Sequence, residues 1–176
     1  MAIDRQKTET VHWHAVFTAS RAEKKVRDRL EELGVECFLP VQTVLRQWTY
    51  RKSRVVVPVI AGLVFVRVGR QEQVKVLQTK GVVAFLRLKG EAGAAVIPDK
   101  QMEDFRFLLD FSEEAVEMTN ENIKAGDLVR VVKGSLRGME GELIRHKGMT
   151  KVLVRIDMLG CAMVNIPASF VEKLNK

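Results

Sequence analysis

Four cations lie close together in one short stretch of the chain, with two aromatic residues among them. The cations are Arg46, Arg51, Lys52 and Arg54, and the aromatic residues are Trp48 and Tyr50. No aspartate or glutamate occurs between Cys37 and Gln71, so the local sequence leaves this charge unneutralised. Phosphates attract cations and bases stack on flat rings, so the stretch indicates a nucleic-acid partner. A solvated loop kept charged for solubility is the alternative interpretation.

Apolar runs on both sides of this stretch predict a strand hairpin that carries it at the tip. Residues 36–47 and 55–57 are the predicted arms, and residues 63–68 are a further predicted strand. A first strand is predicted at residues 12–17.

A helix is predicted after the first strand. Ser20 and Glu23 have the spacing of a capping box, in which both side chains satisfy free amides at a helix start. Gly34 supplies a left-handed stop. Apolar residues at helical spacing form the expected buried face, which consists of Ala22, Val26, Leu30 and Leu33.

Cations recur on the opposite side of the same predicted helix. Arg21, Lys25 and Arg29 follow one another at every fourth position, and we call them the cationic ridge. The ridge is a second candidate surface for an anionic ligand. Three acids at positions 28, 31 and 32 would partly neutralise it, so an ordinary solvated face is the alternative.

The remaining elements of this part define its fold class. Residues 71–80 are predicted as a short helix that ends at Gly81, and residues 82–88 as a strand. Pro98 opens a second long helix, whose expected buried side consists of Met102, Phe105, Leu108 and Leu109. The order β-α-β-β-β-α-β-α predicts an α+β fold, with a mainly antiparallel sheet and flanking helices.

The composition of the sequence changes after residue 111. Residues 112–122 contain four glutamates and no cation, which favours an extended linker. Residues 123–176 contain short strands separated by glycine turns, which predict a small β-barrel. We therefore expect a disordered tail at 1–11, a first domain at 12–111, an acidic linker at 112–122 and a second domain at 123–176.

The first 111 residues hold 19 Lys and Arg against 13 Asp and Glu, and the last 54 hold 10 against 5, so both parts are basic.

Composition narrows the function class. The chain has 176 residues, 47% of them hydrophobic, and a net charge of +7, which favours anionic partners. Its first residues lack the apolar core of a secretory signal, and its longest apolar run, Val55 to Val66, is too short to span a bilayer. Cys37 and Cys161 lie far apart among apolar residues, which indicates reduced thiols in a cytoplasmic protein without a membrane partner.

Catalytic and metal-binding chemistry is not expected. The histidines His12, His14 and His146 have no metal-ligand spacing with either cysteine. A two-metal nuclease needs clustered carboxylates, and the acid-free stretch is the opposite of that pattern. Neither cysteine is flanked by a histidine that could activate it. We therefore predict a protein that is not an enzyme and has no cofactor.

Two segments resemble known modules. Residues 126–143, with Gly134, Gly138 and Gly141, resemble the KOW motif of ribosomal and transcription-elongation proteins, a small SH3-like β-barrel. The amino-terminal part resembles the NGN domain of the NusG family, and the matching features occur in the order that this domain has. They are Trp13, the helix start at Ser20, Phe38-Leu39-Pro40, the basic hairpin, the segment from Ala61 to Val66, the segment from Thr79 to Val82, and Val96 to Pro98. The run from Ile97 to Glu103 and the overall length are similar to UpxY-type antiterminators, relatives of RfaH associated with capsular polysaccharide operons.

The resemblance implies that the first domain binds RNA polymerase. An apolar pocket would seat the clamp helices, and a neighbouring segment, Glu72 to Val74, would meet the opposite jaw. The pocket residues implied by the match are Trp13, Phe17, Leu63, Phe65 and Phe85. All of them are apolar enough to belong to the core instead; Trp13 and Phe85 fit the core better, and Phe17 and Leu63 fit the surface better.

The resemblance also implies contacts with DNA. Lys25, Arg29, Thr79 and Lys80 match the face that would contact the exposed nontemplate strand. The hairpin, with Arg46, Arg51, Lys52 and Arg54, would face upstream DNA without reading its sequence.

The implied function is transcription elongation and antitermination by a monomer that suppresses pausing and termination. The KOW domain would be free to recruit a ribosomal protein or a termination factor. The alternative is a KOW-containing protein that binds RNA or the ribosome and acts in translation.

Overall fold

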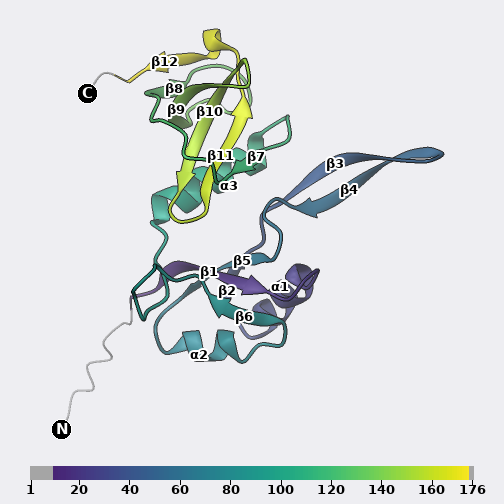
Figure 1. Cartoon of the computed structure of the whole chain (residues 1–176), viewed down its shortest axis with the longest axis vertical. Helices are drawn as coiled ribbons and strands as arrows, with labels where there is room; N and C mark the ends of the chain where they lie inside the picture. Colours follow the sequence, from purple (N-terminus) through teal and green to yellow (C-terminus); the bar gives the residue numbers. More distant parts are fainter. Residues whose placement is uncertain (1–9, 175–176) are drawn as a thin grey trace. The chain divides into compact units, whose positions relative to one another are not determined.

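The structure is a computed structural model that describes residues 10–174. Most of the predicted disordered tail, residues 1–9, lies outside the described residues. The chain folds as two compact units, each made from two separate stretches. Of the described residues, the first unit holds those up to Leu39 together with Gly62–Val96, and the second holds Pro40–Ala61 together with residues 97–174 (Figure 1).

The first unit is an antiparallel sheet with two helices. Its strands have the spatial order β2-β5-β1-β6. Helix α1 contacts β2 and β5, and helix α2 contacts β6. The α+β class with an antiparallel sheet is therefore confirmed. The bounds are β1 (His12–Thr18), α1 (Glu23–Glu32), β2 (Glu36–Phe38), β5 (Leu63–Val68), α2 (Glu72–Leu77) and β6 (Val82–Phe85).

Strand β1 lies between β5 and β6, and its register divides the side chains into two faces. Phe17 lies opposite Leu63 and Ala84, whereas Val16 lies opposite Phe85. Directly opposed residues of an antiparallel pair point to the same face, and successive residues alternate. One face therefore holds Trp13, Phe17, Leu63 and Phe65, and the other holds His14, Val16 and Phe85.

Helix α1 has the predicted buried face but a different start. Val26 and Leu30 are fully buried, whereas Leu33 is 43% exposed, so its expected burial is wrong. The capping box is wrong too, because no side chain caps the first turn and Glu23 instead accepts a hydrogen bond from the amide of Gly62 at 2.7 Å. A positive φ of 58° at Arg21 turns the chain just before the helix, so Ser20 is not its cap. The left-handed stop is confirmed, with φ 75° at Gly34.

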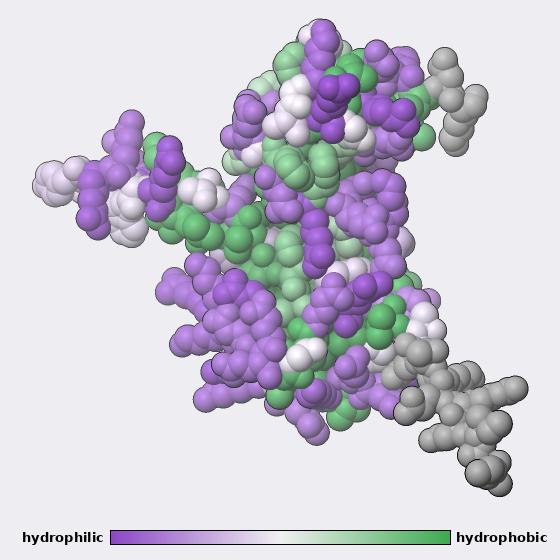
Figure 2. Space-filling view, turned by 180° about the vertical axis from the view of Figure 1, so that it is seen from behind, coloured by the Kyte–Doolittle hydropathy of each residue, from purple (hydrophilic) through white to green (hydrophobic). Residues whose placement is uncertain are grey.

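The second unit contains a long hairpin. Strands β3 (Val41–Trp48) and β4 (Arg51–Pro58) pair along their whole length, from Val41 opposite Pro58 to Trp48 opposite Arg51. We call residues 41–58 the basic hairpin. Figure 2 shows hydrophilic side chains toward its end and hydrophobic ones toward its base. The predicted hairpin with the basic stretch at its tip is confirmed, but its first arm begins at Val41; residues 36–38 of the predicted arm form β2, which pairs with β5 instead.

The rest of the second unit is one helix and one sheet. Helix α3 (Asp99–Phe111) buries Met102, Phe105 and Leu108, as predicted, and packs against β10. The sheet, called the C-terminal sheet, has the order β12-β8-β9-β10-β11-β7. Its pairings are antiparallel, and closure into an SH3-like barrel stays a prediction. The bounds are β7 (Glu117–Thr119), β8 (Asp127–Val131), β9 (Glu140–His146), β10 (Met149–Ile156), β11 (Gly160–Asn165), a 3-10 helix (Ala168–Phe170) and β12 (Val171–Lys173).

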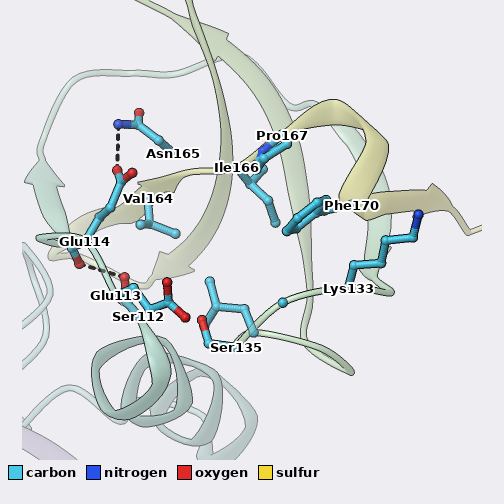
Figure 3. Close-up of a pocket in the computed structure, with 12 residues that line it drawn as sticks. Ser112, Glu113, Glu114, Lys133, Ser135, Val164, Asn165, Ile166, Pro167 and Phe170 are labelled. Atoms are coloured by element: carbon cyan, nitrogen blue, oxygen red, sulfur yellow. Dashed lines mark hydrogen bonds between the residues drawn. The ribbon is translucent and has the colours of Figure 1, made fainter.

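A cavity of about 240 Å³ opens on the second unit (Figure 3). Apolar side chains from β11 and the segment after it line one part, and the acidic segment lines another. Asn165 donates a hydrogen bond to the carboxylate of Glu114 at 2.9 Å across this opening. The lining includes Glu113, Lys133, Val164, Ile166 and Phe170.

The acidic segment 112–122 contains no cation of its own, but one of its glutamates pairs with a lysine elsewhere in the fold. Its residues Glu117–Thr119 form β7, which pairs with β11. The ammonium of Lys151 donates a hydrogen bond to Glu117 Oε1 at 2.6 Å, and the Lys151 side chain is only 1% exposed. This ion pair neutralises one of the glutamates and fixes β7 at the sheet edge. The predicted domain limits at 111 and 122 stay a prediction.

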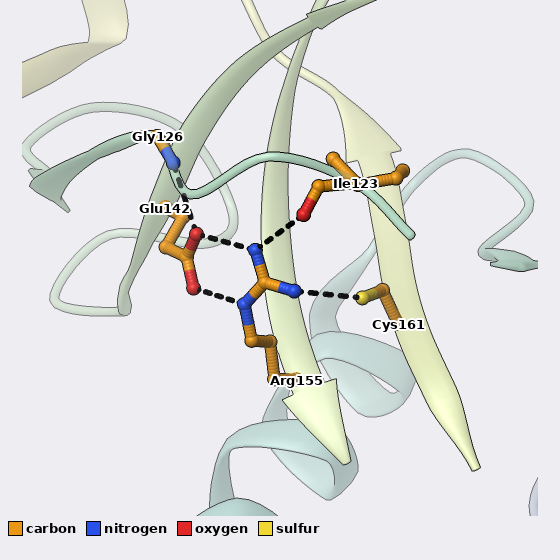
Figure 4. A network of polar contacts seen from close by, with 5 residues as sticks. All are labelled: Ile123, Gly126, Glu142, Arg155 and Cys161. Atoms are coloured by element: carbon orange, nitrogen blue, oxygen red, sulfur yellow. Dashed lines mark hydrogen bonds and ion pairs between the residues drawn. The ribbon is translucent and has the colours of Figure 1, made fainter. Parts of the chain in front are cut away.

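A second ion pair joins β9 to β10 inside the C-terminal sheet (Figure 4). Arg155 donates hydrogen bonds to both carboxylate oxygens of Glu142, at 2.6 and 2.9 Å, and one to the carbonyl oxygen of Ile123 at 3.0 Å. Glu142 also accepts a hydrogen bond from the amide of Gly126 at 3.0 Å. The pair therefore ties the segment before β8 to the sheet.

The Lys151 pair predicts a non-additive effect on stability. We expect Glu117→Ala to lower the free energy of unfolding by about 1 to 3 kcal/mol, because it leaves a buried ammonium without a carboxylate. The double variant Glu117→Ala/Lys151→Met should recover most of this loss, because the buried site is then apolar. Urea unfolding measures all three proteins. A double variant no more stable than Glu117→Ala would contradict the prediction.

The Arg155 pair predicts a pH dependence. The hydrogen bonds from Arg155 hold the pKa of Glu142 below its ordinary value. Glutamate in an unfolded chain has a pKa of about 4.3, so the stabilisation is complete above that pH and is lost as the pH falls through the lower folded pKa. We expect Glu142→Gln to cost about 1 to 3 kcal/mol of stability at pH 7 and much less at pH 3.

The control for this measurement is Glu140→Gln on the same strand. Glu140 forms an exposed ion pair with Arg130, and such pairs contribute little to stability. Urea unfolding at both pH values should separate the two variants. Equal losses in both variants at pH 7 would rule out the stabilising role of the Glu142 pair.

Candidate functional site

Lys25 and Arg29 of the cationic ridge lie on α1, beside the turn after α2 in the first unit. Arg21 precedes the helix with a positive φ, so its predicted place at helical spacing on the ridge is wrong. Arg29 Nη1 donates a hydrogen bond to the carbonyl oxygen of Lys80 at 2.7 Å. The next residue, Gly81, has φ 98°, and a Cβ there would lie 2.8 Å from Cγ2 of Val26. The glycine therefore permits the close approach that places Lys80 beside Arg29. Lys25 lies one helical turn before Arg29, so three of the predicted DNA-contacting residues share one surface.

The acids near the ridge do not neutralise it. Asp28 lies one turn after Lys25 on the same side of the helix, but it forms its ion pair with Arg27, at 2.6 Å. Within residues 10–174, no ion pair involves Arg21, Lys25 or Lys80. The positive charge of this surface is therefore available to a ligand.

Thr79 lies next to Lys80, and its side chain is mostly buried. Its side chain is only 7% exposed, and its hydroxyl donates a hydrogen bond to the carbonyl oxygen of Lys75 at 3.1 Å. The hydroxyl completes the last turn of α2, which is a structural role. Contact of Thr79 with DNA stays a prediction.

The basic hairpin presents all its cations to solvent. Arg46, Arg51, Lys52 and Arg54 are exposed, and none of them has an ion-pair partner in the described part of the chain. The two aromatic residues at its end are exposed as well, Trp48 at 56% and Tyr50 at 97%. Exposed rings beside unpaired cations suit phosphates and bases better than they suit a protein core.

The aromatic face of the first unit is mostly closed. We use this name for the sheet face that holds Trp13, Phe17, Phe38 and Phe65, where Phe38 stacks on Phe65 with ring centroids 6.2 Å apart. Trp13 and Phe65 are buried, and Phe17 is 41% exposed. Phe38 was missed from sequence because its place opposite Phe65 follows only from the pairing of β2 with β5.

Two predictions about the pocket residues need correction. Leu63 is 2% exposed, so its expected surface position is wrong; it lies on the central part of the sheet, opposite Phe17. Phe85 is buried on the other face, where its ring lies edge-on to His14 with centroids 5.8 Å apart. The core position expected for Trp13 and Phe85 is confirmed. Phe17 is thus the accessible member of the predicted set.

The start of α2 presents apolar rather than polar side chains. Glu72 accepts a hydrogen bond from the amide of Gly69 at 3.3 Å, which occupies its carboxylate. Val74 and Leu77, spaced for one side of the helix, are 58% and 41% exposed. Any contact at this segment would therefore be largely apolar.

The remaining chemistry is structural. Burial raises the pKa of the Cys161 thiol, so the thiol stays protonated at neutral pH and is a poor nucleophile. Among the described residues, no three histidine, cysteine, aspartate or glutamate side chains are grouped so that they could hold a metal ion. In residues 10–174, no helix is both long and apolar enough to cross a membrane.

Comparisons with known proteins agree with this architecture. The family model described as transcription termination factor NusG matches residues 11–106. A solved structure described as "Domain interaction in Thermotoga maritima NusG" is 22% identical, with a TM-score of 0.50, and the match covers 94% of this chain and 98% of that chain. A search of curated proteins gave no match.

Two further solved structures are conformations B and A of the MjSpt4:Spt5 complex. Both are 17% identical, and the matches cover 93% of this chain and 97% and 99% of those chains, with TM-scores of 0.31 and 0.29. Of these three structures, the Thermotoga protein, with its TM-score of 0.50, supports a shared fold. Because the family match spans more than half of the chain and includes α1, the basic hairpin and the aromatic face, this chain belongs to the NusG family.

Proposed function

We propose that this protein is a transcription elongation and antitermination factor that binds RNA polymerase and the exposed nontemplate DNA strand and suppresses pausing and termination. The single observation that carries the proposal is the surface formed by Lys25, Arg29 and Lys80, which lies inside the segment that matches the NusG family. Unneutralised cations held in a fixed geometry suit a nucleic-acid backbone. The resemblance of residues 97–103 to UpxY-type factors extends the proposal to capsular polysaccharide operons.

Phe17 is the proposed anchor for the polymerase clamp helices. A half-exposed aromatic side chain on the same sheet face as buried aromatic residues is typical of the residues that dominate binding energy at protein interfaces. The exposed side of α2, with Val74 and Leu77, is the proposed contact with the opposite jaw. A protein that binds both parts in one conformation of polymerase stabilises that conformation, which shifts the population toward elongation.

The basic hairpin is the proposed contact with upstream DNA. Its charge attracts phosphates without reading sequence, which suits a factor that must stay bound while the template moves. The C-terminal sheet, proposed as a KOW domain, would recruit a ribosomal protein or a termination factor. The chain carries out these roles as a monomer through binding alone.

The anchor role predicts a loss of polymerase binding on changing Phe17. We expect Phe17→Asp to weaken binding to RNA polymerase, or to the isolated clamp helices, by about 30-fold or more, the effect of losing an interface hot spot. The control is Val83→Asp, an exposed apolar residue on β6 that lies outside the aromatic face. Co-purification with ribosomal subunits and not with polymerase would favour the alternative function in translation. Unchanged affinity in a folded Phe17→Asp protein would remove the pocket assignment.

The DNA surface predicts a change in salt dependence. We expect Lys25→Gln/Lys80→Gln to lower the slope of log affinity against log salt for single-stranded DNA by about 1.4, because two phosphate contacts are lost. Arg29 is kept because it supports the turn at Lys80. The control is Arg87→Gln/Lys89→Gln, which removes the same charge from exposed residues beyond β6. A slope that falls equally in both variants would show that only net charge matters.

A further inference from the structure

The register of the basic hairpin places its aromatic residue and its cations on defined faces. Trp48 lies directly opposite Arg51, and Arg46 lies two residues before Trp48 on the same strand. Opposed residues and residues two apart share a face, so these three side chains stand together. Lys52 and Arg54 lie on the other face, opposite Gln47 and Leu45.

The two faces therefore differ in kind, although each has two cations. On the first face, the exposed Trp48 has Arg46 two residues before it on the same strand, about 7 Å away between Cα atoms, and Arg51 directly across, about 5 Å away between Cβ atoms. On the second face the cations stand beside Leu45, which is 63% exposed, and carry no flat ring. Only the first face combines phosphate binding with a surface on which a base can stack.

We infer that the Trp48 face binds unpaired nucleotides of a single-stranded nucleic acid, with the indole stacked on a base and Arg46 and Arg51 on the flanking phosphates. In a duplex both faces of each base are covered by its neighbours, so the indole could reach one only by unstacking it. A single strand presents those faces freely. The absence of any aspartate or glutamate between Cys37 and Gln71 adds charge complementarity to the stacking geometry.

The inference deepens the proposed function and rests on the hairpin being a nucleic-acid contact. The Lys52 and Arg54 face, which has cations without a ring, suits duplex phosphates. One hairpin with these two faces fits the junction where a duplex meets an unpaired strand. The stacking face is independent of sequence, because every base has a π-face.

The test uses the full chain without polymerase and a mixed-sequence oligonucleotide of about 12 nucleotides, an upper-range site for one stacking platform. The same strand is offered unpaired, annealed into a duplex, and as RNA. Trp13 is 5% exposed and Trp48 is 56% exposed, so quenching of tryptophan fluorescence by the oligonucleotide reports on Trp48. We expect the unpaired DNA strand and the RNA strand to quench the fluorescence of Trp48, and the duplex to quench it little.

Substitutions then separate stacking from charge. We expect Trp48→Leu to weaken single-strand binding about 5- to 150-fold, the range for one lost stacked base, and Trp48→Phe to retain most of it. Arg46→Gln/Arg51→Gln should weaken single-strand binding more than Lys52→Gln/Arg54→Gln, although both remove two charges from one hairpin. Equal losses in the two pairs, or a Trp48→Leu protein that binds the single strand within about twofold of wild type, would overturn the inference.

Polymerase binding measured on the same variants distinguishes this inference from the proposed function. If Trp48→Leu binds single strands normally while the wild type still binds polymerase and suppresses pausing, the inference fails and the function stands. If the wild type does not bind polymerase but loses single-strand affinity on Trp48→Leu, the function fails and the stacking face stands.

Discussion

Strand β1 pairs with β5 on one side and with β6 on the other, and the register of these pairs determines which side chains lie on each face of the first unit's sheet. A slip of one residue would exchange the two faces, which would bury Phe17 and expose Val16. His14 opposes such a slip. Burial lowers the pKa of its imidazole, which is therefore neutral, and its Nδ1–H donates a hydrogen bond to the carbonyl oxygen of Ala95 at 2.8 Å. Breaking that buried bond would leave two polar groups unpaired.

The basic hairpin is under a different constraint, because its own packing cannot hold it tightly. A two-stranded ribbon is at best marginally stable in water. The apolar pair Val44 and Val55 and the pair Gln42 and Val57 lie on one face near its base, whereas the end carries only exposed residues. The cations on the two neighbouring strands also repel one another. An anionic ligand removes that repulsion. A ligand that binds the hairpin therefore also stabilises the hairpin.

Local patterns in the sequence predicted most elements and their order, but they joined β2 and β3 into one arm and missed β7 in the acidic segment. The spacing of Val26 and Leu30 predicted α1, and the apolar runs around the basic stretch predicted the hairpin. The errors arose wherever a residue has a distant partner. Glu23 has the spacing of a capping box, but its partner is the amide of Gly62, 39 residues away. Lys151 was unremarkable in the sequence, although it pairs with Glu117 and brings part of the acidic segment into the sheet.

The candidate site shows the same division between local and distant information. The cations at Lys25 and Arg29 follow from helical spacing, but Lys80 joins them only because Gly81 lets its turn approach α1. Residue type alone did not distinguish Leu63 from Phe17, since the two lie opposite each other and differ in what covers them. The opposite orientation of Phe85 depends on the β1–β6 register, which shifts between Phe17 and Thr18. The residue pattern of a single strand does not reveal a shift in its pairing with another strand.

The two cationic surfaces belong to different units of one chain, and this has a consequence for binding strength. The ridge is in the first unit and the basic hairpin is in the second, joined through Leu39–Pro40 and through the segment that ends at Gly62. Each surface offers a few phosphate contacts, which give weak binding at physiological salt when they act alone. In the proposed function, the second surface then binds the same nucleic acid as an intramolecular step, which raises the overall affinity without new contacts. Discrimination between paired and unpaired strands then requires only that the two surfaces differ in chemistry. They do differ, because the indole of Trp48 stands on the hairpin while the ridge bears cations alone.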